Sequence, residues 1–404
     1  MIERPYYTHT ITSYIDKPFV KVITGLRRSG KSMLLLSLKN ELLQRGIAPE
    51  NIIYINFESF NFADIDTDKK LYQYIKNKIS NNKRHYLLID EIQEVENWEK
   101  AINAFRVDFD ADLYITGSNS HLLSSELATY LAGRYIEIPV YTLSFNEYLL
   151  FRKHYAGITQ PNIIAEFNLY QRKGGFPAIH TGNYSDDMIY KAVYDIYSSA
   201  ILRDTIQRNK IRDVELLERV VKFVFDNVGN NFSAKTIADY FKSQQRRIDL
   251  NTVYNYLNAL ESAFIIYRIP RYDLKGKEIL KTNEKYFVGD QSLLYALMGY
   301  KDRIIGGVLE NIVMLELKRK GYKVFIGKLN TKEIDFVAEK QNHKIYIQVA
   351  WRLNDQSTID REFSTLKAIT DNHPKYVIST EENWHDNIDG IQHHHIAHFL
   401  NNIL

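Results

Sequence analysis

Short apolar runs alternate with helical stretches along the first part of the chain. The runs cover residues 19–24, 52–57, 86–89, 113–116 and 135–140. Because they are continuously apolar, without the polar alternation of a half-exposed strand, they are typical of strands buried on both faces of a parallel sheet. A helical pattern from Met33 to Leu43 follows the first run. The pattern therefore predicts an α/β domain on a parallel sheet over residues 1–142.

The hydrophobic pattern changes twice after residue 142. From about residue 143 to residue 220 it is helical, interrupted by Gly174-Gly175-Phe176-Pro177, and this predicts a helical domain over residues 143–228. Two short helices and a hairpin pattern occupy residues 229–290, and a mixed α/β pattern fills residues 291–404. A chain of 404 residues also exceeds what one compact core usually holds. We therefore expect four domains.

The segment between the first predicted strand and the first predicted helix carries a specific motif. It reads Gly-Leu-Arg-Arg-Ser-Gly-Lys-Ser from Gly25 to Ser32, a full GxxxxGK[ST]. Glycines let backbone N–H groups close around phosphate oxygens, and the helix N-terminus adds its dipole. Lys31 is expected to reach the outer phosphates, and the Ser32 hydroxyl is expected to ligate Mg²⁺. The sequence thus predicts a site for ATP with Mg²⁺.

Two adjacent carboxylates, Asp90 and Glu91, end the apolar strand that begins at Tyr86. Asp90 is expected to hold the Mg²⁺ water shell, and Glu91 to polarise the water that attacks the γ-phosphate. The alternative is that the pair only caps the next helix. Its place downstream of the glycine loop, with one strand between, favours the hydrolytic interpretation.

Two further segments are candidates for contact with the phosphates. Ser118 and Asn119 follow the strand that ends at Thr116, where a hydroxyl or amide can touch the γ-phosphate or orient the water. An ordinary turn is the alternative, since Gly, Ser and Asn are common turn residues. Arg134 precedes the last strand and is expected to stabilise transition-state charge at a neighbouring subunit's nucleotide. A solvated arginine at a strand entrance is the alternative there.

Composition restricts the classes of protein and partner. The formal net charge is +3, from 52 Lys and Arg against 49 Asp and Glu, so any basic surface for nucleic acid must be local. The absence of cysteine excludes disulfides, thiolate chemistry and zinc sites built on cysteine. No segment approaches the length of a membrane span, and the first residues lack the layout of a secretory signal. We expect a cytoplasmic protein without a membrane partner.

These motifs, in this order, resemble the AAA+ superfamily, and within it the bacterial and archaeal ATPases that pair an AAA+ core with a C-terminal domain of unknown function, DUF4143. The resemblance extends over nearly the whole chain and implies a P-loop ATPase core with a helical lid. It implies a Walker A loop at Gly25, Gly30, Lys31 and Ser32, with Arg27, Arg28 and Ser29 inside it, a Walker B pair at Asp90 and Glu91, a sensor 1 at Ser118 and Asn119, and an arginine finger at Arg134. The Gly174–Pro177 stretch also resembles this family, but the lid around Gly175 lacks the arginine of a sensor 2.

Residues 229–290 look like a winged-helix domain. Seven basic residues would lie on its inter-helix loop and wing, and five of them are the candidate DNA contacts: Arg246, Arg247, Arg268, Arg271 and Lys275. Such a face is expected to bind the phosphates of duplex DNA in a salt-dependent way. The alternatives are solvated basic residues on a wing, or a module for protein interaction.

The last domain has a layout that resembles the PD-(D/E)xK nuclease fold. Glu310 lies on its helix, Asp335 ends a strand pair, and a third strand carries Gln348 and Ala350. In active members a second acid and a lysine stand at the positions of Gln348 and Ala350. An amide is a weak ligand for a hard cation, and alanine supplies no charge. We expect no cleavage at this degenerate site, and a role in binding or docking.

The sequence as a whole predicts an ATPase in which hydrolysis drives or times a conformational change. Duplex DNA, a protein partner and self-association are the candidate interactions beyond ATP. One alternative is a slow nucleotide-dependent switch that recognises a protein partner, and self-association with ATP through Arg134 would argue against it. A nuclease regulated by ATP is a further alternative, which Gln348 and Ala350 argue against.

Overall fold

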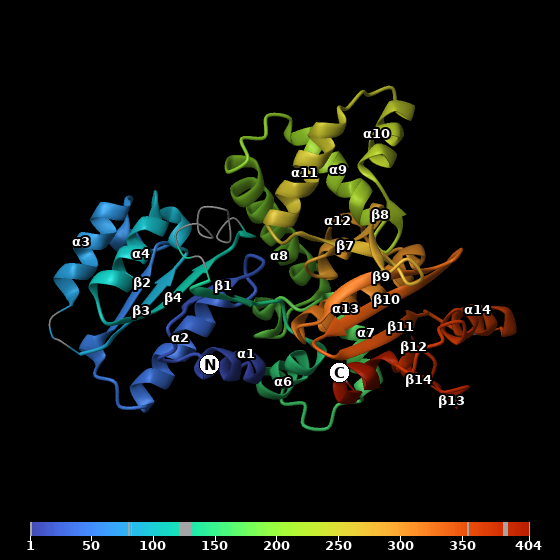
Figure 1. The fold of residues 1–404 in the computed structure, drawn as a ribbon, viewed down its shortest axis with the longest axis horizontal. Helices are drawn as coiled ribbons and strands as arrows, with labels where there is room; N and C mark the ends of the chain where they lie inside the picture. The colour runs from blue at the N-terminus through green and yellow to red at the C-terminus, as the bar shows by residue number, and fades with distance from the viewer. Residues whose placement is uncertain are drawn as a thin grey trace. The chain divides into compact units, whose positions relative to one another are not determined.

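A computed structural model of the chain describes residues 2–79, 81, 83–120, 131, 133–353, 355–382 and 387–403 (Figure 1). Its contacts divide the chain into two compact units. The first comprises Met1–Val140 with Ser262–Phe264, and the second comprises Tyr141–Glu261 with Ile265–Leu404. Within the described residues, none of the helices combines the length and the apolar character needed to cross a bilayer.

The first unit is built on one parallel sheet of five strands in the order β2-β3-β4-β1-β5. The strands are β1 (Val20–Thr24), β2 (Ile52–Asn56), β3 (His85–Asp90), β4 (Ala111–Gly117) and β5 (Tyr135–Pro139). β1 is the central partner of β4 and β5, with Lys21 opposite Tyr114 and Val20 opposite Tyr135. The parallel α/β sheet predicted from the apolar runs is therefore confirmed.

Helices cover both faces of this sheet, which explains why most residues of its strands are apolar. The helices are α1 (Pro5–Ser13), α2 (Lys31–Gln44), α3 (Asp68–Lys78) and α4 (Trp98–Asp108). Val22 lies in the core formed with α3 and α4, whereas its neighbour Ile23 lies in the core formed with α1 and α2. Figure 1 shows the two helix pairs on opposite sides of the strands. Successive side chains of β1 thus enter two different cores.

The second unit begins with helices, as the sequence pattern predicts. They are α6 (Phe145–Ala156), α7 (Ile163–Lys173), α8 (Asp186–Ser199), the π-helix Ala200–Gln207, α9 (Val214–Asp226), α10 (Ala234–Ser243) and α11 (Leu250–Ser262). Polar residues determine where these helices start: Ser144 and Glu147 form a capping box at α6, and Asn162 caps α7. Gly174 ends α7 with a positive φ, and its backbone passes so close to the Asp290 carboxylate that a side chain would clash.

A mixed sheet of nine strands forms the rest of the second unit, in the order β13-β14-β12-β11-β10-β9-β7-β8-β6. The strands are β6 (Asn231–Phe232), β7 (Ile266–Asp273), β8 (Glu278–Val288), β9 (Lys323–Leu329), β10 (Lys332–Lys340), β11 (His343–Val349), β12 (Lys375–Ser379), β13 (Asn387–Ile388) and β14 (Ile391–His395). The accompanying helices are α12 (Ser292–Met298), α13 (Ile305–Arg319), α14 (Gln356–Lys367) and α15 (Ile396–His398), followed by a π-helix over Phe399–Ile403.

One strand pairing joins segments that the sequence pattern assigns to different domains. The β7–β8 hairpin lies where the wing is expected, but β7 also pairs in parallel with β9, with Arg271 opposite Ile326. The domain boundary expected at residue 290 therefore lies between strands of one continuous sheet. The pairing is non-local, so the local hydrophobic pattern does not contain it.

Candidate functional site

The loop between β1 and α2 has a backbone that only glycine allows at its first position. Gly25 has φ +142°, and a Cβ there would lie 2.1 Å from the carbonyl oxygen of Val140. Gly30, directly before α2, has φ +102°, and Arg28 adopts the left-handed region with φ +65°. The predicted phosphate loop therefore folds as a tight turn against the chain that follows β5.

Two basic side chains hold this loop. The Lys31 ammonium is buried and donates to the carbonyl oxygens of Gly25 at 3.0 Å and Leu26 at 3.2 Å. From the start of α1, the Arg4 guanidinium donates to the carbonyl oxygen of Ser29 at 2.8 Å. The sequence predicts the role of Lys31 but not that of Arg4, which lies outside the motif.

Asp90 lies at the end of β3 and is completely buried. The Thr116 hydroxyl donates to its Oδ1 atom, and its carboxylate also forms a hydrogen bond with the Ser32 side chain. Burial raises the pKa of Asp90, and these two hydrogen bonds oppose the increase. A serine hydroxyl beside a carboxylate is an oxygen ligand set of the kind that Mg²⁺ prefers, so the residues fit the ion.

Glu91 follows in the left-handed conformation, with φ +55° and ψ +49°. Its backbone N–H donates to the Thr116 hydroxyl at 3.0 Å, so one threonine bonds both acidic residues. The Glu91 carboxylate accepts hydrogen bonds from the Gln93 amide and, at 3.4 Å, from the Ser118 hydroxyl. Backbone strain at a non-glycine residue is typical of functional sites. Thr116 and Gln93 had no role in the sequence prediction.

The predicted nucleotide residues meet at one edge of the first unit's sheet. Ser118 and Asn119 follow β4, are both buried, and lie next to the ends of β1 and β3 because β4 pairs with both strands. Ligands of open parallel sheets bind outside the carboxyl ends of the strands. Of the loop arginines, Arg27 donates to Glu58 at 3.0 Å, whereas Arg28 is exposed.

Arg134 lies at the opposite end of this sheet, where the parallel strands begin. Its carbonyl oxygen accepts a hydrogen bond from Val20 at the start of β1, whereas the phosphate loop follows the end of β1. The five residues of β1 separate these two ends of the sheet, a distance of about 16 Å at the usual rise per residue. The Arg134 side chain is exposed. The structure therefore does not bring Arg134 to the phosphate loop of its own chain.

In the second unit, two residues of the degenerate nuclease site, Glu310 and Asp335, lie against a lysine that the sequence prediction missed. The Lys285 ammonium on β8 lies 3.0 Å from Glu310 Oε2, 2.8 Å from Glu333 Oε1 and 3.6 Å from Asp335 Oδ1. A cavity of about 440 Å³ opens beside them. Burial raises the pKa of Glu310 and that of Asp335, and the nearby Lys285 ammonium opposes both increases. Lys285 is one of four charged residues in β8, with Glu278, Lys281 and Glu284, so no signal in the sequence alone singled it out.

Gln348 and Ala350 lie where the sequence places them, at the end of β11. The Gln348 amide accepts from the Asp335 N–H at 2.7 Å and donates to Glu362 at 2.8 Å. Ala350 packs into the core of the sheet with α14. Gln348 is thus a hydrogen-bonding bridge between two acidic residues, and Ala350 is a packing residue.

The five candidate DNA contacts are placed unequally. Arg246 pairs with Glu215 at 3.1 Å, and Arg268 pairs with Glu261 at 3.2 Å. Arg271 lies on β7, between β8 and β9 in the sheet. Arg247 and Lys275 are exposed. Carboxylates beside two of the five reduce the positive charge offered to a phosphate backbone.

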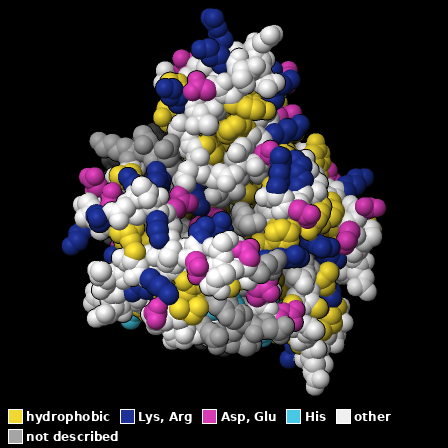
Figure 2. Space-filling view, turned by 90° about the vertical axis from the view of Figure 1, so that its right-hand side faces the viewer, with side chains coloured by type: hydrophobic (Ala, Val, Ile, Leu, Met, Phe, Trp, Pro, Cys, Tyr) yellow, Lys and Arg dark blue, Asp and Glu magenta, His cyan; other side chains and the backbone are white. Residues whose placement is uncertain are grey.

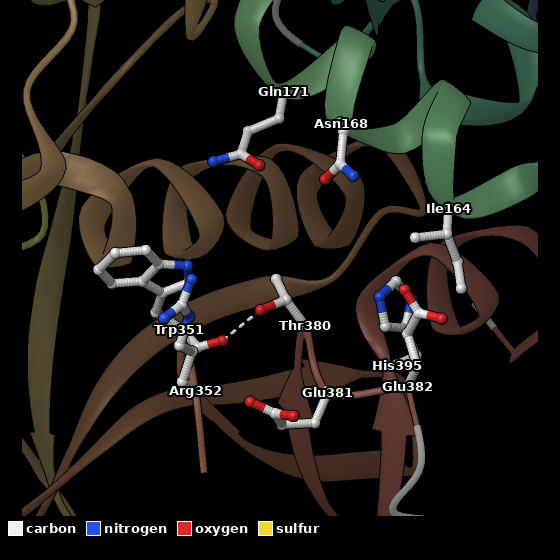
Figure 3. A pocket seen from close by; sticks show the side chains of 9 residues that line it. All are labelled: Ile164, Asn168, Gln171, Trp351, Arg352, Thr380, Glu381, Glu382 and His395. Atoms are coloured by element: carbon white, nitrogen blue, oxygen red, sulfur yellow. Dashed lines mark hydrogen bonds between the residues drawn. The ribbon is translucent and has the colours of Figure 1, made fainter. Parts of the chain in front are cut away.

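A second concave site of the same unit has no counterpart in the sequence prediction (Figure 3). It lies between α7 and the carboxyl ends of the parallel strands β11, β12 and β14, and its volume is about 460 Å³. Its lining is Ile164, Asn168, Gln171, Trp351, Arg352, Thr380, Glu381, Glu382 and His395. The Thr380 hydroxyl donates to the carbonyl oxygen of Trp351, which ties the ends of β11 and β12 together. Arg352 lies 4.7 Å over the Trp351 ring.

Three family models match consecutive parts of the chain. An AAA domain matches residues 17–149, a domain of unknown function, DUF8612, matches residues 164–303, and a second domain of unknown function, DUF4143, matches residues 305–397. The AAA match contains the phosphate loop, Asp90, Glu91, Ser118 and Arg134.

Relatives match over much greater lengths. An uncharacterized protein of Haemophilus influenzae is 39% identical, over 99% of this chain and 98% of its own length. An uncharacterized protein of Methanocaldococcus jannaschii, MJ1544, is 32% identical, over 87% of this chain and 79% of its own length. Among solved structures, a Walker-type ATPase of Pyrococcus abyssi is 15% identical, over 74% of this chain and 96% of that one, with a TM-score of 0.45. The chain therefore belongs to the bacterial and archaeal family of ATPases in which an AAA domain is followed at the carboxyl end by a DUF4143 domain.

Proposed function

We propose that the chain binds ATP with Mg²⁺ at the loop from Gly25 to Ser32 and hydrolyses it. The observation that carries the proposal is the link between three separate motifs. Ser32 of the loop and Thr116 of β4 both bond the buried Asp90 carboxylate, and Thr116 also fixes the backbone of Glu91. The loop, the acidic pair and the end of β4 thus form one hydrogen-bonded site, as phosphoryl transfer requires.

Each residue has a defined task in this site. The N–H groups of the loop and the Lys31 ammonium bind the outer phosphates, and Lys31 exchanges its carbonyl partners for phosphate oxygens. Ser32 and Asp90 would hold Mg²⁺, which supplies neutralisation of the charge that develops on the phosphates. Ser118 and Asn119 border the γ-phosphate and orient the attacking water.

Glu91 is the residue that activates the water. Its carboxylate is bonded to Gln93 and Ser118, so it must exchange at least one of these partners for the water molecule. This exchange would connect the nucleotide state to the activity of Glu91, because the same Ser118 hydroxyl that bonds Glu91 is proposed to contact the γ-phosphate. Hydrolysis would then drive or time a change of conformation.

The experiment that tests the proposal is steady-state ATP turnover by the full chain with Mg²⁺. Glu91→Gln should abolish turnover while ATP binding persists, and Lys31→Ala should reduce binding itself. The matched control is Glu96→Gln, the same change at an exposed carboxylate in the following loop. Turnover that is equal in wild type and Glu91→Gln would refute hydrolysis and leave the slow nucleotide-dependent switch as the function.

Partners beyond ATP enter the same experiment as additions. Figure 2 shows Lys and Arg side chains interspersed with Asp and Glu side chains on the face that it displays. This mixed surface and the ion pairs of Arg246 and Arg268 do not distinguish a DNA-binding site from a protein-binding site. Turnover per chain that rises several-fold with duplex DNA would identify DNA as a partner. Turnover per chain that rises only with protein concentration would indicate self-association. The cytoplasmic location expected from the sequence stays a prediction.

A further inference from the structure

Lys285 is among the most buried cationic side chains of the second unit. It lies on β8, its side chain is 4% exposed, and three carboxylates from two other elements surround its ammonium. Glu310 comes from α13, and Glu333 and Asp335 come from β10. The proposed ATPase site lies in the other compact unit and does not use this cluster.

The ammonium matches its surroundings in number and geometry. A lysine ammonium is a compact charge with three N–H donors, and three carboxylate oxygens lie at 3.0, 2.8 and 3.6 Å from it. A side-chain amide holds together two of the elements that carry these groups. Asn311, next to Glu310, accepts from the Val288 N–H at 2.6 Å and donates to the Val288 carbonyl oxygen at 3.0 Å, which clamps α13 to β8.

The metal that the nuclease-like layout implies does not fit these residues. A divalent ion between Glu310 and Asp335 would need the same carboxylate oxygens that face the ammonium, and the two cations would repel each other. Where a further acid would complete the ligand set, the Gln348 amide is already bonded to Asp335 and Glu362. Across the residues that the structure describes, no three His, Cys, Asp or Glu side chains are arranged to hold a metal ion.

We propose that the Lys285 ammonium is the resident cation of this centre and stands in place of a divalent metal. It joins the β7–β8 hairpin to α13 and β10, so the two sequence segments on either side of residue 290 form one rigid body. The centre then binds no Mg²⁺ or Mn²⁺ and cleaves no phosphodiester. Without Lys285, the three uncompensated carboxylates would repel one another, and a hard divalent cation in the vacated position would draw them into a ligand set.

The test is a gain of metal binding, measured with Mn²⁺ alone by electron paramagnetic resonance on the full chain without nucleotide. Lys285→Met should bind one Mn²⁺ at least tenfold more tightly than wild type does. A second substitution, Glu310→Gln, should abolish that site. Lys332→Met is the matched control, because Lys332 lines the same cavity but is exposed and donates to Ser364. It removes one positive charge without vacating the ammonium position, so it should behave as wild type.

Two outcomes would overturn the proposal. One is folded Lys285→Met that binds Mn²⁺ no better than wild type. The other is Mn²⁺ binding by the wild-type chain, or nicking of plasmid DNA by it with Mn²⁺, when Glu310→Gln abolishes that binding or nicking. That result would make Lys285 the lysine of an active nuclease centre. The wild-type comparison decides the question even if Lys285→Met does not fold. Neither outcome depends on ATP hydrolysis.

Discussion

The close approach at Gly25 gives a direct test of the nucleotide site. A Cβ at Gly25 would lie 2.1 Å from the Val140 carbonyl oxygen, where ordinary contact begins at 3.4 Å. Gly25→Ala must therefore move the loop or the chain after β5 by more than 1 Å. The loop also carries Lys31, whose ammonium is bonded to the carbonyl oxygens of Gly25 and Leu26. The displacement therefore reaches the group that binds the phosphates.

The expected loss of ATP affinity follows from that displacement. A misplacement of about 1 Å at a positioned group lowers a reaction rate by a factor on the order of 100. We take the same factor for the affinity that depends on the position of Lys31. In binding free energy this is about 2.7 kcal/mol. We expect Gly25→Ala to raise the Kd for ATP by about this factor, measured by titration with a fluorescent ATP analogue and by calorimetry.

Gly46 provides the matched control. It also has a positive φ, +84°, but no atom lies within 4 Å of the position of its Cβ. Gly46→Ala therefore introduces the backbone strain of alanine at positive φ but no steric conflict. This strain should lower the free energy of unfolding by about 1 to 2 kcal/mol. Its Kd should equal that of wild type. Gly25→Ala that is folded and binds ATP within threefold of wild type would refute the reasoning.

Three further predictions concern residues outside the phosphate loop. Burial lowers the pKa of His180 from 6.5 to about 4, and its Nε2 lies 2.8 Å from the Gly174 carbonyl oxygen. The contribution of the neutral ring is therefore complete above about pH 6.5 and is lost as the pH falls toward 4, by up to about 3 kcal/mol. Urea unfolding at pH 7.5 and pH 5 should show about 2 kcal/mol of this loss in wild type and a smaller loss in His180→Gln. Arg134→Ala should leave the Kd for ATP unchanged and lower turnover by at least about 100-fold. Wild-type turnover per chain should then rise with protein concentration, and a rate independent of concentration would contradict action between subunits. Arg4→Ala should weaken ATP binding about tenfold through loss of the bond to Ser29, whereas Arg45→Ala, at an exposed arginine at the end of α2, should not.

The elements and the main motifs of the ATPase core follow from local sequence. Its strands are continuous apolar runs because helices cover both faces of the sheet, and that pattern is visible without a structure. The loop from Gly25 to Ser32 needs its glycines for local backbone reasons. Since the carboxyl ends of parallel strands meet at one edge, Asp90 and Ser118 could be placed near the loop from chain order alone.

The partners that hold these residues depend on contacts between distant segments. Thr116 bonds Asp90 and Glu91 across 25 or 26 residues of sequence, and Arg4 reaches Ser29 across 25. Neither residue differs in type from many others in the chain. In the second unit, β7 meets β9 through a pairing that no local pattern contains. Such contacts follow from tertiary packing, and one sequence does not display them.

Two of the buried lysines, Lys31 and Lys285, show why residue type alone does not identify a binding group. Lys31 donates to two carbonyl oxygens, which are neutral acceptors, whereas Lys285 lies among three carboxylates. Both ammonium groups donate charge-assisted hydrogen bonds, but only the partners of Lys285 are themselves ions, and an unpaired buried carboxylate is costly. A phosphate can therefore draw Lys31 from its carbonyl partners, because the carbonyl groups remain uncharged when it leaves. No phosphate can draw Lys285 from its site without leaving three anions uncompensated. The charge of the acceptors thus makes one lysine a ligand-binding group and the other a permanent part of the fold.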